Sequence, residues 1–378
     1  MSNLRSRELR SRITSRGELE LSLEDVAVPE PAADEVIVRI EAAPLNPSDI
    51  ILLLGPADLD TLRASSREGR PVTTAVVPDA RRPALAPRLD LALPVGNEGA
   101  GTVVQAGEEA TALLGRTVAI RASAGTYAEY RHASARDCLV LPEGVSAREG
   151  AAAFINPLTA LGMTETMRRE GHRALVHTAA ASSLGQMLNR LCLADGINLV
   201  NIVRNRSQVG LLRGLGATHV LDSTDPMFRN ALKAALEETG ATLAFDAIGG
   251  GTMAATILAA MEEVAKRRLP AYSRYGSPVH KQVYIYGALD PGPRIIEGDL
   301  GMAWSVGGWL MTWFYERIGG ADAGRLRERA ASALTTIFAS RYAAEIGLAN
   351  ALAPETIRAY ARRATGEKYL ITPHVDLC

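Results

Sequence analysis

The sequence has few cysteines and no long apolar run. Cys138, Cys192 and Cys378 are the only cysteines among its 378 residues. They are too few and too scattered for a disulfide framework or for zinc-ligand spacing. No apolar run reaches the roughly 18 residues that a membrane-spanning helix needs. Residues 1–17 are polar and lack the apolar core of a signal peptide. We therefore expect a globular, cytoplasmic protein with more than one domain.

The chain also lacks a net charge of one sign. Lysine and arginine together number 41 against 42 acidic residues, a formal net charge of −1. Proteins that bind nucleic acids usually carry a basic excess, so this balance argues against a nucleic-acid partner. Lysine occurs only at Lys233, Lys266, Lys281 and Lys368, and every other basic residue is arginine. Because arginine replaces lysine almost throughout the chain, most of the arginines are not assigned a functional role.

Short β-branched runs separated by glycine and proline fill the first part of the chain. The pattern predicts strands at 36–42, 102–104, 117–120, 126–130 and 138–142. Many short strands with turns between them favour a barrel-like all-β unit.

The segment 56–94 differs from its surroundings. Six prolines and many arginines interrupt any periodicity there, and only 73–77 is predicted to form a strand. A loop of this length in a compact domain is usually functional or mobile. We therefore predict a long loop at 56–94.

After about residue 145, apolar strands alternate with helical segments. The predicted strands are 174–178, 197–203, 219–221, 242–246 and 282–286. This alternation indicates an α/β fold with a doubly wound parallel sheet.

A turn of small residues follows the first of these strands. Its candidate cofactor-binding residues are Ala180, Ser182, Ser183, Leu184 and Gly185. Small residues let backbone amides and a helix N-terminus approach a pyrophosphate, where the helix dipole favours negative charge. Of the three glycines in a dinucleotide fingerprint only Gly185 is present, so an ordinary tight turn remains the alternative.

Arg204, Asn205 and Arg206 follow the second strand. A fold that selects NAD places an acidic residue here, about 20 residues after the turn, to bind the ribose 2′-hydroxyl. Arginine instead accommodates the 2′-phosphate of NADP. The sequence therefore predicts NADP (NADPH) as cofactor and disfavours S-adenosylmethionine, whose sites also prefer an acidic residue. Solvated arginines in an arginine-rich chain are the alternative.

Two more strand ends carry candidate cofactor-binding residues. Gly249 and Gly250 follow the fourth predicted strand, and Tyr286 and Gly287 end the fifth. Dinucleotides lie at the carboxyl edge of such sheets, so these residues are predicted to approach the cofactor. Tight turns are the alternative. His177, inside the first strand, is predicted to be a packed core residue.

Taken together, these residues resemble the zinc-independent branch of the medium-chain dehydrogenase/reductase family. The stretches that carry the resemblance, in order along the chain, are Ala43-Pro44-Leu45-Asn46-Pro47-Ser48-Asp49-Ile50, Gly96-Asn97-Glu98-Gly99, Asn156-Pro157-Leu158-Thr159-Ala160, the turn and Arg204 region above, Leu215-Gly216-Ala217-Thr218-His219-Val220, Asp246-Ala247-Ile248-Gly249-Gly250 and Ala364-Thr365-Gly366-Glu367-Lys368. Each stretch is modestly specific, and their order along one chain is strongly specific.

The resemblance implies two domains. Residues 1–153 and 345–378 would form a GroES-like β-barrel catalytic domain, and 154–344 a Rossmann domain that binds NADP. It also implies a homodimer formed through the Rossmann domains. Zinc-dependent relatives carry Gly-His-Glu where this chain has Gly96-Asn97-Glu98, and some carry a lobe of four cysteines. Both features are missing from the sequence, so we expect a metal-independent enzyme.

The resemblance also assigns individual residues. Asn46 becomes the candidate catalytic residue, a polar group near the nicotinamide, with a turn-forming asparagine before Pro47 as the alternative. Thr159 would contact the nicotinamide carboxamide, and Lys368 would contact the cofactor. Asp49 is expected to cap the following helix, and Glu98 to be a buried structural carboxylate.

Two branches of the family compete as models. Quinone oxidoreductases pass hydride from NADPH to quinones, and enoyl-thioester reductases reduce a C=C bond beside a thioester. The second branch carries a catalytic tyrosine a few residues after Asn-Pro-Ser-Asp, where this chain has Leu53-Leu54-Gly55-Pro56-Ala57. We therefore predict an NADPH-dependent reductase of a quinone or another activated C=C electrophile. An enoyl-thioester (CoA or acyl-carrier-protein) reductase and a catalytically quiet NADPH-binding redox sensor are the alternatives.

Overall fold

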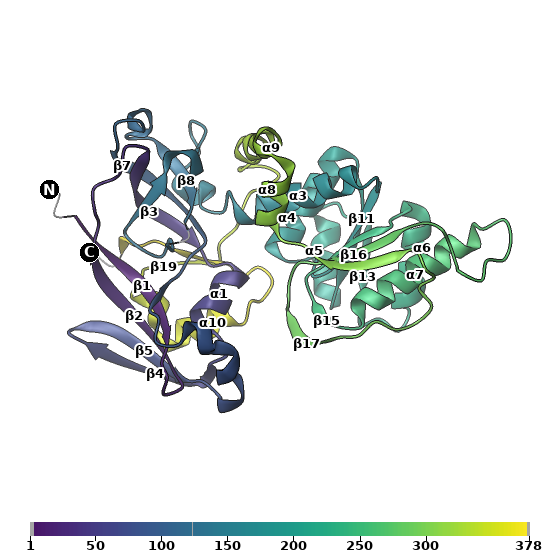
Figure 1. The fold of residues 1–378 in the computed structure, drawn as a ribbon, viewed down its shortest axis with the longest axis horizontal. Coiled ribbons are helices and arrows are strands. Elements are labelled where there is room, and N and C mark those ends of the chain that lie inside the picture. The colour runs from purple at the N-terminus through teal and green to yellow at the C-terminus, as the bar shows by residue number, and fades with distance from the viewer. Residues whose placement is uncertain (1–3, 123, 376–378) are drawn as a thin grey trace. The chain divides into compact units, whose positions relative to one another are not determined.

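The computed structural model describes residues 4–122 and 124–375. The chain divides into two compact units, one made of Met1–Ile155 with Arg329–Cys378 and the other of Asn156–Glu328 (Figure 1). Both ends of the chain thus contribute to the first unit. The domain boundaries implied by the resemblance, at 153/154 and 344/345, remain a prediction.

Two β-sheets build the first unit. One has five strands in the order β4-β5-β2-β1-β6, all antiparallel: β1 (Arg5–Ile13), β2 (Glu18–Ala27), β4 (Asp58–Arg67), β5 (Arg70–Val76) and β6 (Leu93–Pro94). The other runs β10-β8-β7-β3-β20-β19, with β9 also paired to β3: β3 (Glu35–Pro44), β7 (Glu98–Ala106), β8 (Thr117–Arg121), β9 (Tyr130–Ser134), β10 (Cys138–Val140), β19 (Ala344–Ile346) and β20 (Tyr369–Ile371). Its helices are α1 (Pro47–Leu54), α2 (Ala147–Gly150) and α10 (Pro354–Ala361). Because β20 pairs with β3, the C-terminal segment completes a sheet begun near the N-terminus.

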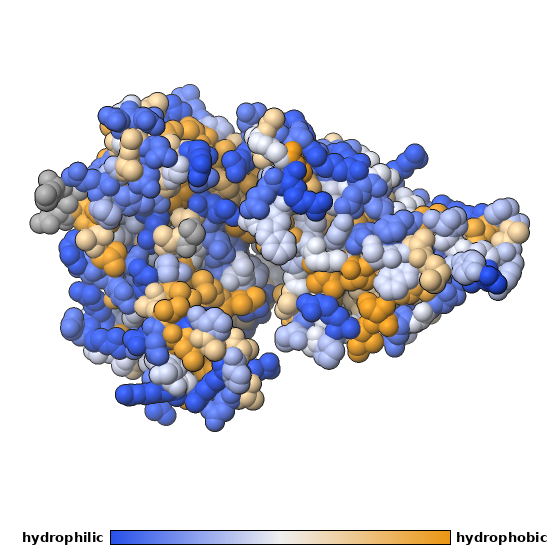
Figure 2. Space-filling view, in the orientation of Figure 1, coloured by the Kyte–Doolittle hydropathy of each residue, from blue (hydrophilic) through white to orange (hydrophobic). Residues whose placement is uncertain are grey.

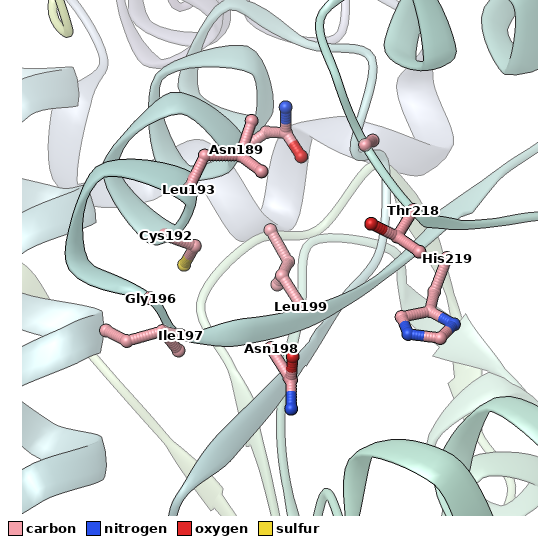
Figure 3. Close-up of a pocket in the computed structure, with 10 residues that line it drawn as sticks. Asn189, Cys192, Leu193, Gly196, Ile197, Asn198, Leu199, Thr218 and His219 are labelled. Carbon is pink, nitrogen blue, oxygen red and sulfur yellow. The ribbon is translucent and has the colours of Figure 1, made fainter.

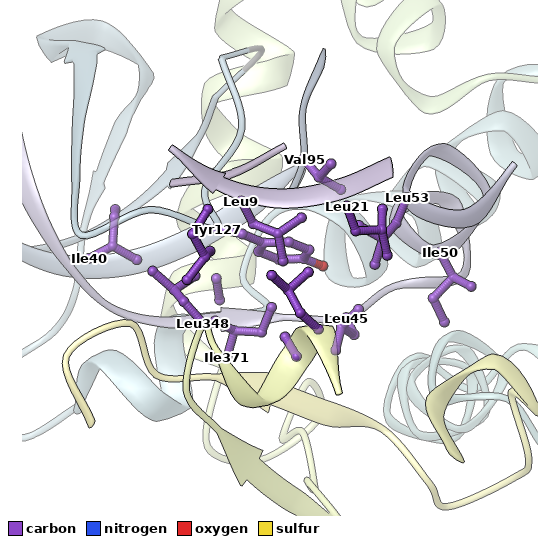
Figure 4. Close-up of a cluster of buried hydrophobic side chains, with 14 of the residues drawn as sticks. Leu9, Leu21, Ile40, Leu45, Ile50, Leu53, Val95, Tyr127, Leu348 and Ile371 are labelled. Atoms are coloured by element: carbon purple, nitrogen blue, oxygen red, sulfur yellow. The ribbon is translucent and has the colours of Figure 1, made fainter. Parts of the chain in front are cut away.

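The core of this unit lies between strands from both ends of the chain. Figure 4 shows Tyr127 surrounded by aliphatic side chains, among them Leu9 and Leu348. Tyr127 is fully buried, and its hydroxyl donates a hydrogen bond to the carbonyl of Pro44 at 3.0 Å. The ring therefore fills the core, while its polar atom is satisfied at the end of β3.

The long loop predicted at 56–94 is wrong. The segment instead forms the β4–β5 hairpin, a 3₁₀ helix at Asp79–Arg88 and the short strand β6. β5 pairs with β2, and the Thr73 hydroxyl donates to the Leu352 carbonyl at 2.6 Å. Only Leu62 of β4 is buried, so this edge strand carries almost no apolar alternation for a sequence pattern to reveal.

The strand predicted at 126–130 is also wrong, because β9 begins only at Tyr130. The amides of Thr126 and Tyr127 donate instead to the carbonyls of Gly96 and Val95. This turn directs the Tyr127 ring into the core, and it explains why an apolar, aromatic stretch does not extend as a strand.

The second unit confirms the predicted doubly wound sheet. Six parallel strands run in the order β13-β12-β11-β14-β16-β18: β11 (Ala174–His177), β12 (Asn198–Val203), β13 (His219–Asp222), β14 (Leu243–Asp246), β16 (Lys281–Ile285) and β18 (Trp304–Gly308). Counted along the chain, this order is 3-2-1-4-5-6, which is that of the dinucleotide-binding Rossmann fold. The glycine-rich strand β15 (Gly249–Gly251) pairs with β17 (Asp290–Arg294) beside it.

Helices precede, connect and follow these strands. They are α3 (Ile155–Arg169), α4 (Ser183–Asp195), α5 (Arg206–Gly214), α6 (Phe228–Thr239), α7 (Met253–Arg267), α8 (Met311–Ile318) and α9 (Gly320–Ser332). Within the described part of the chain, none of the helices is both long and apolar enough to cross a membrane.

A buried ion pair joins α7 to the sheet. The Lys281 ammonium, at the first residue of β16, contacts the Glu262 carboxylate, and both side chains are at most 1% exposed. Glu262 also accepts the amide of Ser277 at 2.8 Å. A Cβ on Gly276 or Gly301 would lie within 2.6 Å of the same carboxylate. These two glycines therefore leave the space that the carboxylate occupies.

Candidate functional site

The strand order of the second unit locates its candidate site. In a doubly wound sheet the ligand lies beyond the carboxyl ends of the strands, at the point where the strand order reverses. Here that point lies between β11 and β14, which are neighbours in the sheet. The segments that follow β11, β12, β14 and β16 contain most of the residues predicted from the sequence to bind a cofactor.

The turn after β11 leads into a well-capped helix. Ser182 is the N-cap of α4, and its hydroxyl accepts the amide of Gly185 at 3.1 Å. Ala180 lies beneath the turn, fully buried, with its amide bonded to the Ile202 carbonyl. Ser183 is partly exposed in the first turn of α4, and Leu184 is buried. The turn therefore offers the N-terminus of a 13-residue helix, as an anion site requires.

Gly185 is required by close packing in this turn. A Cβ on Gly185 would lie 2.2 Å from the carbonyl oxygen of Ala180. Gly185→Ala should therefore push α4 away from the turn and lower the free energy of unfolding by about 1–3 kcal/mol. Urea denaturation measures the change.

Gly210→Ala is the matched control, because Gly210 lies in α5 and a Cβ there meets nothing within 4 Å. Alanine in that open helix interior should raise stability by up to about 1 kcal/mol. Equal effects of the two alanines would contradict the packing argument.

The segment after β12 carries two exposed arginines. Arg204 follows the last strand residue, and Arg206 begins α5. Between them, Asn205 caps α5 by accepting the amide of Gln208 at 3.0 Å. Among the described residues, neither guanidinium is paired with a carboxylate. The two guanidinium groups therefore lie at the N-terminus of α5, an arrangement that suits an anionic group.

Hydrogen bonds of Thr178 and Asp246 connect the ends of β11 and β14. The Thr178 hydroxyl donates to Asp246 at 2.7 Å and accepts the amide of Ala247 at 2.8 Å. Asp246 also accepts the amides of Ile248 and Gly249. The sequence did not predict the Thr178–Asp246 hydrogen bond, because the two residues are 68 positions apart and neither belongs to a recognisable motif.

The glycines that follow β14 and β16 pack closely. A Cβ on Gly250 would lie 2.7 Å from the Asp290 carboxyl carbon, and one on Gly287 would lie 2.6 Å from the Ala247 carbonyl. Gly249 has φ +81°, in the left-handed region that favours glycine. The tight turns given above as the alternative are present, and the approach of these residues to a cofactor stays a prediction.

His177 and Tyr286 form a buried pair at the same edge. His177 Nε2 lies 2.8 Å from the Tyr286 hydroxyl, and the two rings stack with centroids 5.7 Å apart. Burial lowers the pKa of His177 to about 3, so the imidazole is neutral. The prediction that His177 is a core residue is confirmed. Thr159, predicted to bind the nicotinamide, lies in α3 and is 7% exposed.

The first unit holds the remaining predicted residues. Asn46 is the N-cap of α1 and is 1% exposed. Asp49 accepts the Asn46 amide at 2.9 Å and the Asn97 amide at 2.9 Å. The expectation that Asp49 caps the helix is thus confirmed. Its second bond also ties α1 to the turn before β7.

Glu98, the first residue of β7, is the hub of a buried polar cluster. One carboxylate oxygen accepts Asn46 Nδ2 at 2.8 Å, and the other accepts the amides of Phe154 and Ile155, each at 2.9 Å. Glu98 is fully buried, which confirms the expected structural carboxylate. The nearby Lys368 ammonium is also inaccessible, and it lies 5.8 Å from the centre of the Tyr342 ring. Asn46, Glu98, Asp49 and Lys368 are called the polar cluster below.

Known proteins resemble this chain in both sequence and fold. A solved structure from Mesorhizobium loti, described as an NADPH:quinone reductase, covers 99% of both chains with a TM-score of 0.73 and 26% identity. In sequence and fold, the chain is similar to the medium-chain dehydrogenase/reductase family. Two curated relatives are a mitochondrial enoyl-[acyl-carrier-protein] reductase from Xenopus tropicalis, 30% identical, and a chloroplastic quinone-oxidoreductase homolog from Spinacia oleracea, 31% identical.

The sequence alignments are partial. Each covers 53% of this chain, and they cover 51% and 56% of the Xenopus and Spinacia proteins, so the chain spans about half the length of the curated relatives it matches. A Bacillus thuringiensis structure described as an NADPH:quinone reductase matches with a TM-score of 0.72 over 98% of this chain and 99% of its own, but at 20% identity it supports the fold alone. No family model matches the sequence.

The polar cluster makes the stability of this protein depend on pH. Burial, opposed by the Asn46 amide, raises the pKa of Asp49 from 3.8 to about 7. Between these two values the native carboxyl keeps a proton that the unfolded chain has lost. Its contribution to stability therefore falls as the pH rises through that window.

Asp49→Asn should remove this pH dependence. Relative to the variant, the free energy of unfolding of the wild type should fall by at most about 1.4 kcal/mol per pH unit as the pH rises. Urea denaturation at a series of pH values between 3.8 and 7 measures both slopes. Parallel curves for the two proteins would show that Asp49 does not hold its proton in the native state.

A small cavity of about 160 Å³ lies elsewhere in the second unit (Figure 3). Its walls include Cys192, Asn198 and His219, from the end of α4 and the starts of β12 and β13. The starts of parallel strands lie at the amino edge of the sheet, opposite the switch point. The cavity is therefore distinct from the candidate cofactor site. Burial raises the pKa of the Cys192 thiol, which makes it a poor nucleophile.

Within the described residues, no group of three or more His, Cys, Asp or Glu side chains is arranged to hold a metal ion.

Proposed function

We propose that this chain is an NADPH-dependent reductase that passes hydride, without a metal, to a quinone or another activated C=C electrophile. The observation that carries the proposal is the pair of arginines after β12 of a sheet with the dinucleotide-binding order, Arg204 and Arg206, which have no carboxylate partner among the described residues. Arginines at this point suit a 2′-phosphate, which NADPH has and NADH lacks.

The residues around the switch point fit such a cofactor. We expect the capped start of α4 to receive a pyrophosphate, with Ser182, Ser183, Leu184 and Gly185 closest and the buried Ala180 packed behind them. Gly249, Gly250 and Gly287 carry no side chains at the neighbouring strand ends, and we expect their backbone to approach the cofactor. Arg204, Asn205 and Arg206 would hold the 2′-phosphate. Tyr286 supports the edge from its stack on His177.

When bound, NADPH supplies the hydride, and the protein supplies orientation and a polar environment. Thr159 of the second unit is proposed to contact the nicotinamide carboxamide, and Asn46 is proposed as the catalytic polar group of the first unit. Asn46 is well held for this role, because its side chain donates to the buried Glu98 and its amide to Asp49. Beside it, Ile51 of α1 is 51% exposed, and Figure 2 shows apolar residues over α1 that suit a flat or acyl substrate.

Two acceptor classes have separate support. The name of the Mesorhizobium loti protein favours a quinone, and that of the Xenopus tropicalis protein an enoyl thioester. The deciding assay is NADPH absorbance, followed in the presence of a chelator, with a benzoquinone in one arm and an enoyl thioester in the other. Turnover with either acceptor supports the proposal. NADPH binding without turnover in both arms would instead favour a quiet redox sensor.

Assembly and location belong to the same proposal. A homodimer formed through the second unit is supported by β18, which stands at the edge of the six-stranded sheet. Cytoplasmic location stays a prediction, and two of the relatives carry the words mitochondrial and chloroplastic in their names. Sedimentation analysis tests the dimer.

A further inference from the structure

The loop between α7 and β16 exposes large apolar side chains on the second unit. Tyr272 is 93% exposed, Tyr275 is 59% exposed, and Met302 of the segment before β18 is 75% exposed. The Met302 amide donates to the Tyr275 carbonyl at 3.1 Å, so the two segments lie side by side. Figure 1 shows the chain projecting beyond the end of α7 at this place. Residues 268–280 together with Met302 are called the projecting loop below.

The projecting loop carries positive charge without negative charge. Residues 268–280 include Arg268 and Arg274 but neither aspartate nor glutamate. Both arginines are exposed. The Arg268 guanidinium donates to the backbone carbonyl of Glu237 at 2.8 Å, and that of Arg274 lies 4.6 Å from the centre of the Tyr275 ring. Among the described residues, neither guanidinium is paired with a carboxylate, so the loop offers two positive charges to an anionic partner.

The base of the projecting loop is held in place by the buried ion pair described above. The Ser277 amide donates to the Glu262 carboxylate at 2.8 Å, and Glu262 pairs with Lys281 at the start of β16. Ser277 is itself buried. The exposed side chains therefore extend from a base that is fixed to α7 and to the sheet, and replacing them should not disturb the fold.

We propose that the projecting loop docks on the surface of an anionic lipid membrane. Tyrosine is enriched at membrane–water interfaces, because its ring is apolar and its hydroxyl stays hydrated there. Arginine buries its methylene groups in the same region while its guanidinium binds headgroup phosphates. The loop thus combines the two attractions that peripheral membrane binding uses, apolar burial and charge. This proposal goes beyond the proposed function and does not depend on it.

The form and charge of the loop favour a lipid surface over other partners. Protein interfaces seat an aromatic anchor in a pocket and surround it with contacts that exclude water. Tyr272 stands on a projecting segment with little surface around it for such contacts, whereas a headgroup layer deforms around a projection. In a symmetric contact between two copies of the chain, Arg268 and Arg274 would approach their own counterparts and repel them. The net charge of −1 argues against a nucleic acid.

Flotation of the full chain with lipid vesicles tests the proposal. At low salt we expect binding to vesicles of phosphatidylglycerol and phosphatidylcholine in equal parts, and much weaker binding to phosphatidylcholine alone. Added salt should release the protein, because ions screen the attraction between exposed arginines and headgroups.

Two double variants separate the contributions of charge and of apolar burial. Arg268→Gln with Arg274→Gln should weaken binding to the mixed vesicles by roughly fivefold for each arginine, and it should reduce the salt dependence. Tyr272→Ser with Met302→Ser should also weaken binding, but should leave the salt dependence as in the wild type. Urea denaturation should give both variants the wild-type midpoint, because all four side chains are exposed.

The matched controls are exposed residues outside the projecting loop. Arg213→Gln removes an exposed arginine of α5, and Leu114→Ser removes an exposed apolar side chain of the first unit. Both variants should bind the mixed vesicles as tightly as the wild type.

Several results would overturn the proposal. They are no binding to the mixed vesicles at low salt, equal binding to phosphatidylcholine alone, and wild-type binding by both double variants. Polyglutamate that binds as tightly as the mixed vesicles, with no loss in Tyr272→Ser, would assign the loop to an acidic protein instead. A dimer in lipid-free sedimentation that Tyr272→Ser dissociates would assign it to a second copy of the chain. None of these measurements uses reductase turnover, so their failure leaves the proposed function untouched.

Discussion

Lys281→Met is expected to lower the free energy of unfolding by about 3–5 kcal/mol, the usual cost of removing one partner of a buried ion pair. The substitution leaves the Glu262 carboxylate fully buried without its cation. Lys266 is the next nearest ammonium, at 3.8 Å, and it is already bonded to Asp299. Native stability is commonly only about 5–15 kcal/mol, so the variant should unfold at clearly lower urea concentrations.

Replacing both partners separates two contributions to the loss of stability: the lost attraction between Lys281 and Glu262, and the burial of a carboxylate without a cation. Lys281→Met combined with Glu262→Leu replaces both charges with apolar groups, and it should recover part of the loss. Lys233→Met removes one partner of the exposed Lys233–Glu263 pair, and it should cost at most about 1 kcal/mol. A double variant less stable than Lys281→Met would show that the glycines around Glu262 form a site that only the ion pair can fill.

Replacing Arg204 and Arg206 together with glutamate should abolish the preference for NADPH over NADH. A hydrogen bond to a charged group contributes about 1.5–3 kcal/mol, so each arginine bound to the 2′-phosphate should account for roughly 10- to 150-fold in affinity. Both side chains are exposed, and that places the loss toward the lower end of the range. Fluorescence titrations with the two cofactors measure the two Kd values.

The control for this experiment is Arg213→Glu in the last turn of α5, because this residue is exposed and basic like the other two. It should leave the ratio of the two Kd values unchanged. NADH affinity of the double variant should also stay close to wild type, because NADH has no 2′-phosphate. An unchanged preference for NADPH in the double variant would remove both arginines from the site.

The sequence predicts the second unit well because its signals are local. Buried strands such as Ala174–His177 are apolar except for a final histidine and alternate with helices, so the doubly wound sheet follows from the pattern alone. The turn at Gly185 and the arginines after β12 also stand at fixed places relative to their strands. Their roles in binding stay predictions, although the structure places them at one edge of the sheet.

The features that the sequence did not predict depend on contacts between distant segments. β1 buries the polar residues Ser6, Glu8 and Ser11 along with its apolar ones, so its apolar alternation is too weak to mark a strand. Glu262 and Lys281 are 19 residues apart, and only the fold makes them partners. The environment of Lys368 arises in the same way, from the meeting of β7, α1 and the segment before β20. No spacing along the chain encodes such a cluster.

A single-turnover experiment tests the central claim most directly. The protein in excess over NADPH, with a chelator present, is mixed with a benzoquinone or with an enoyl thioester, and the cofactor absorbance is followed. The account predicts that bound NADPH is stable alone and is oxidised completely by at least one of the two acceptors. Bound NADPH that survives both acceptors, or oxidation that stops when the chelator is added, would contradict it.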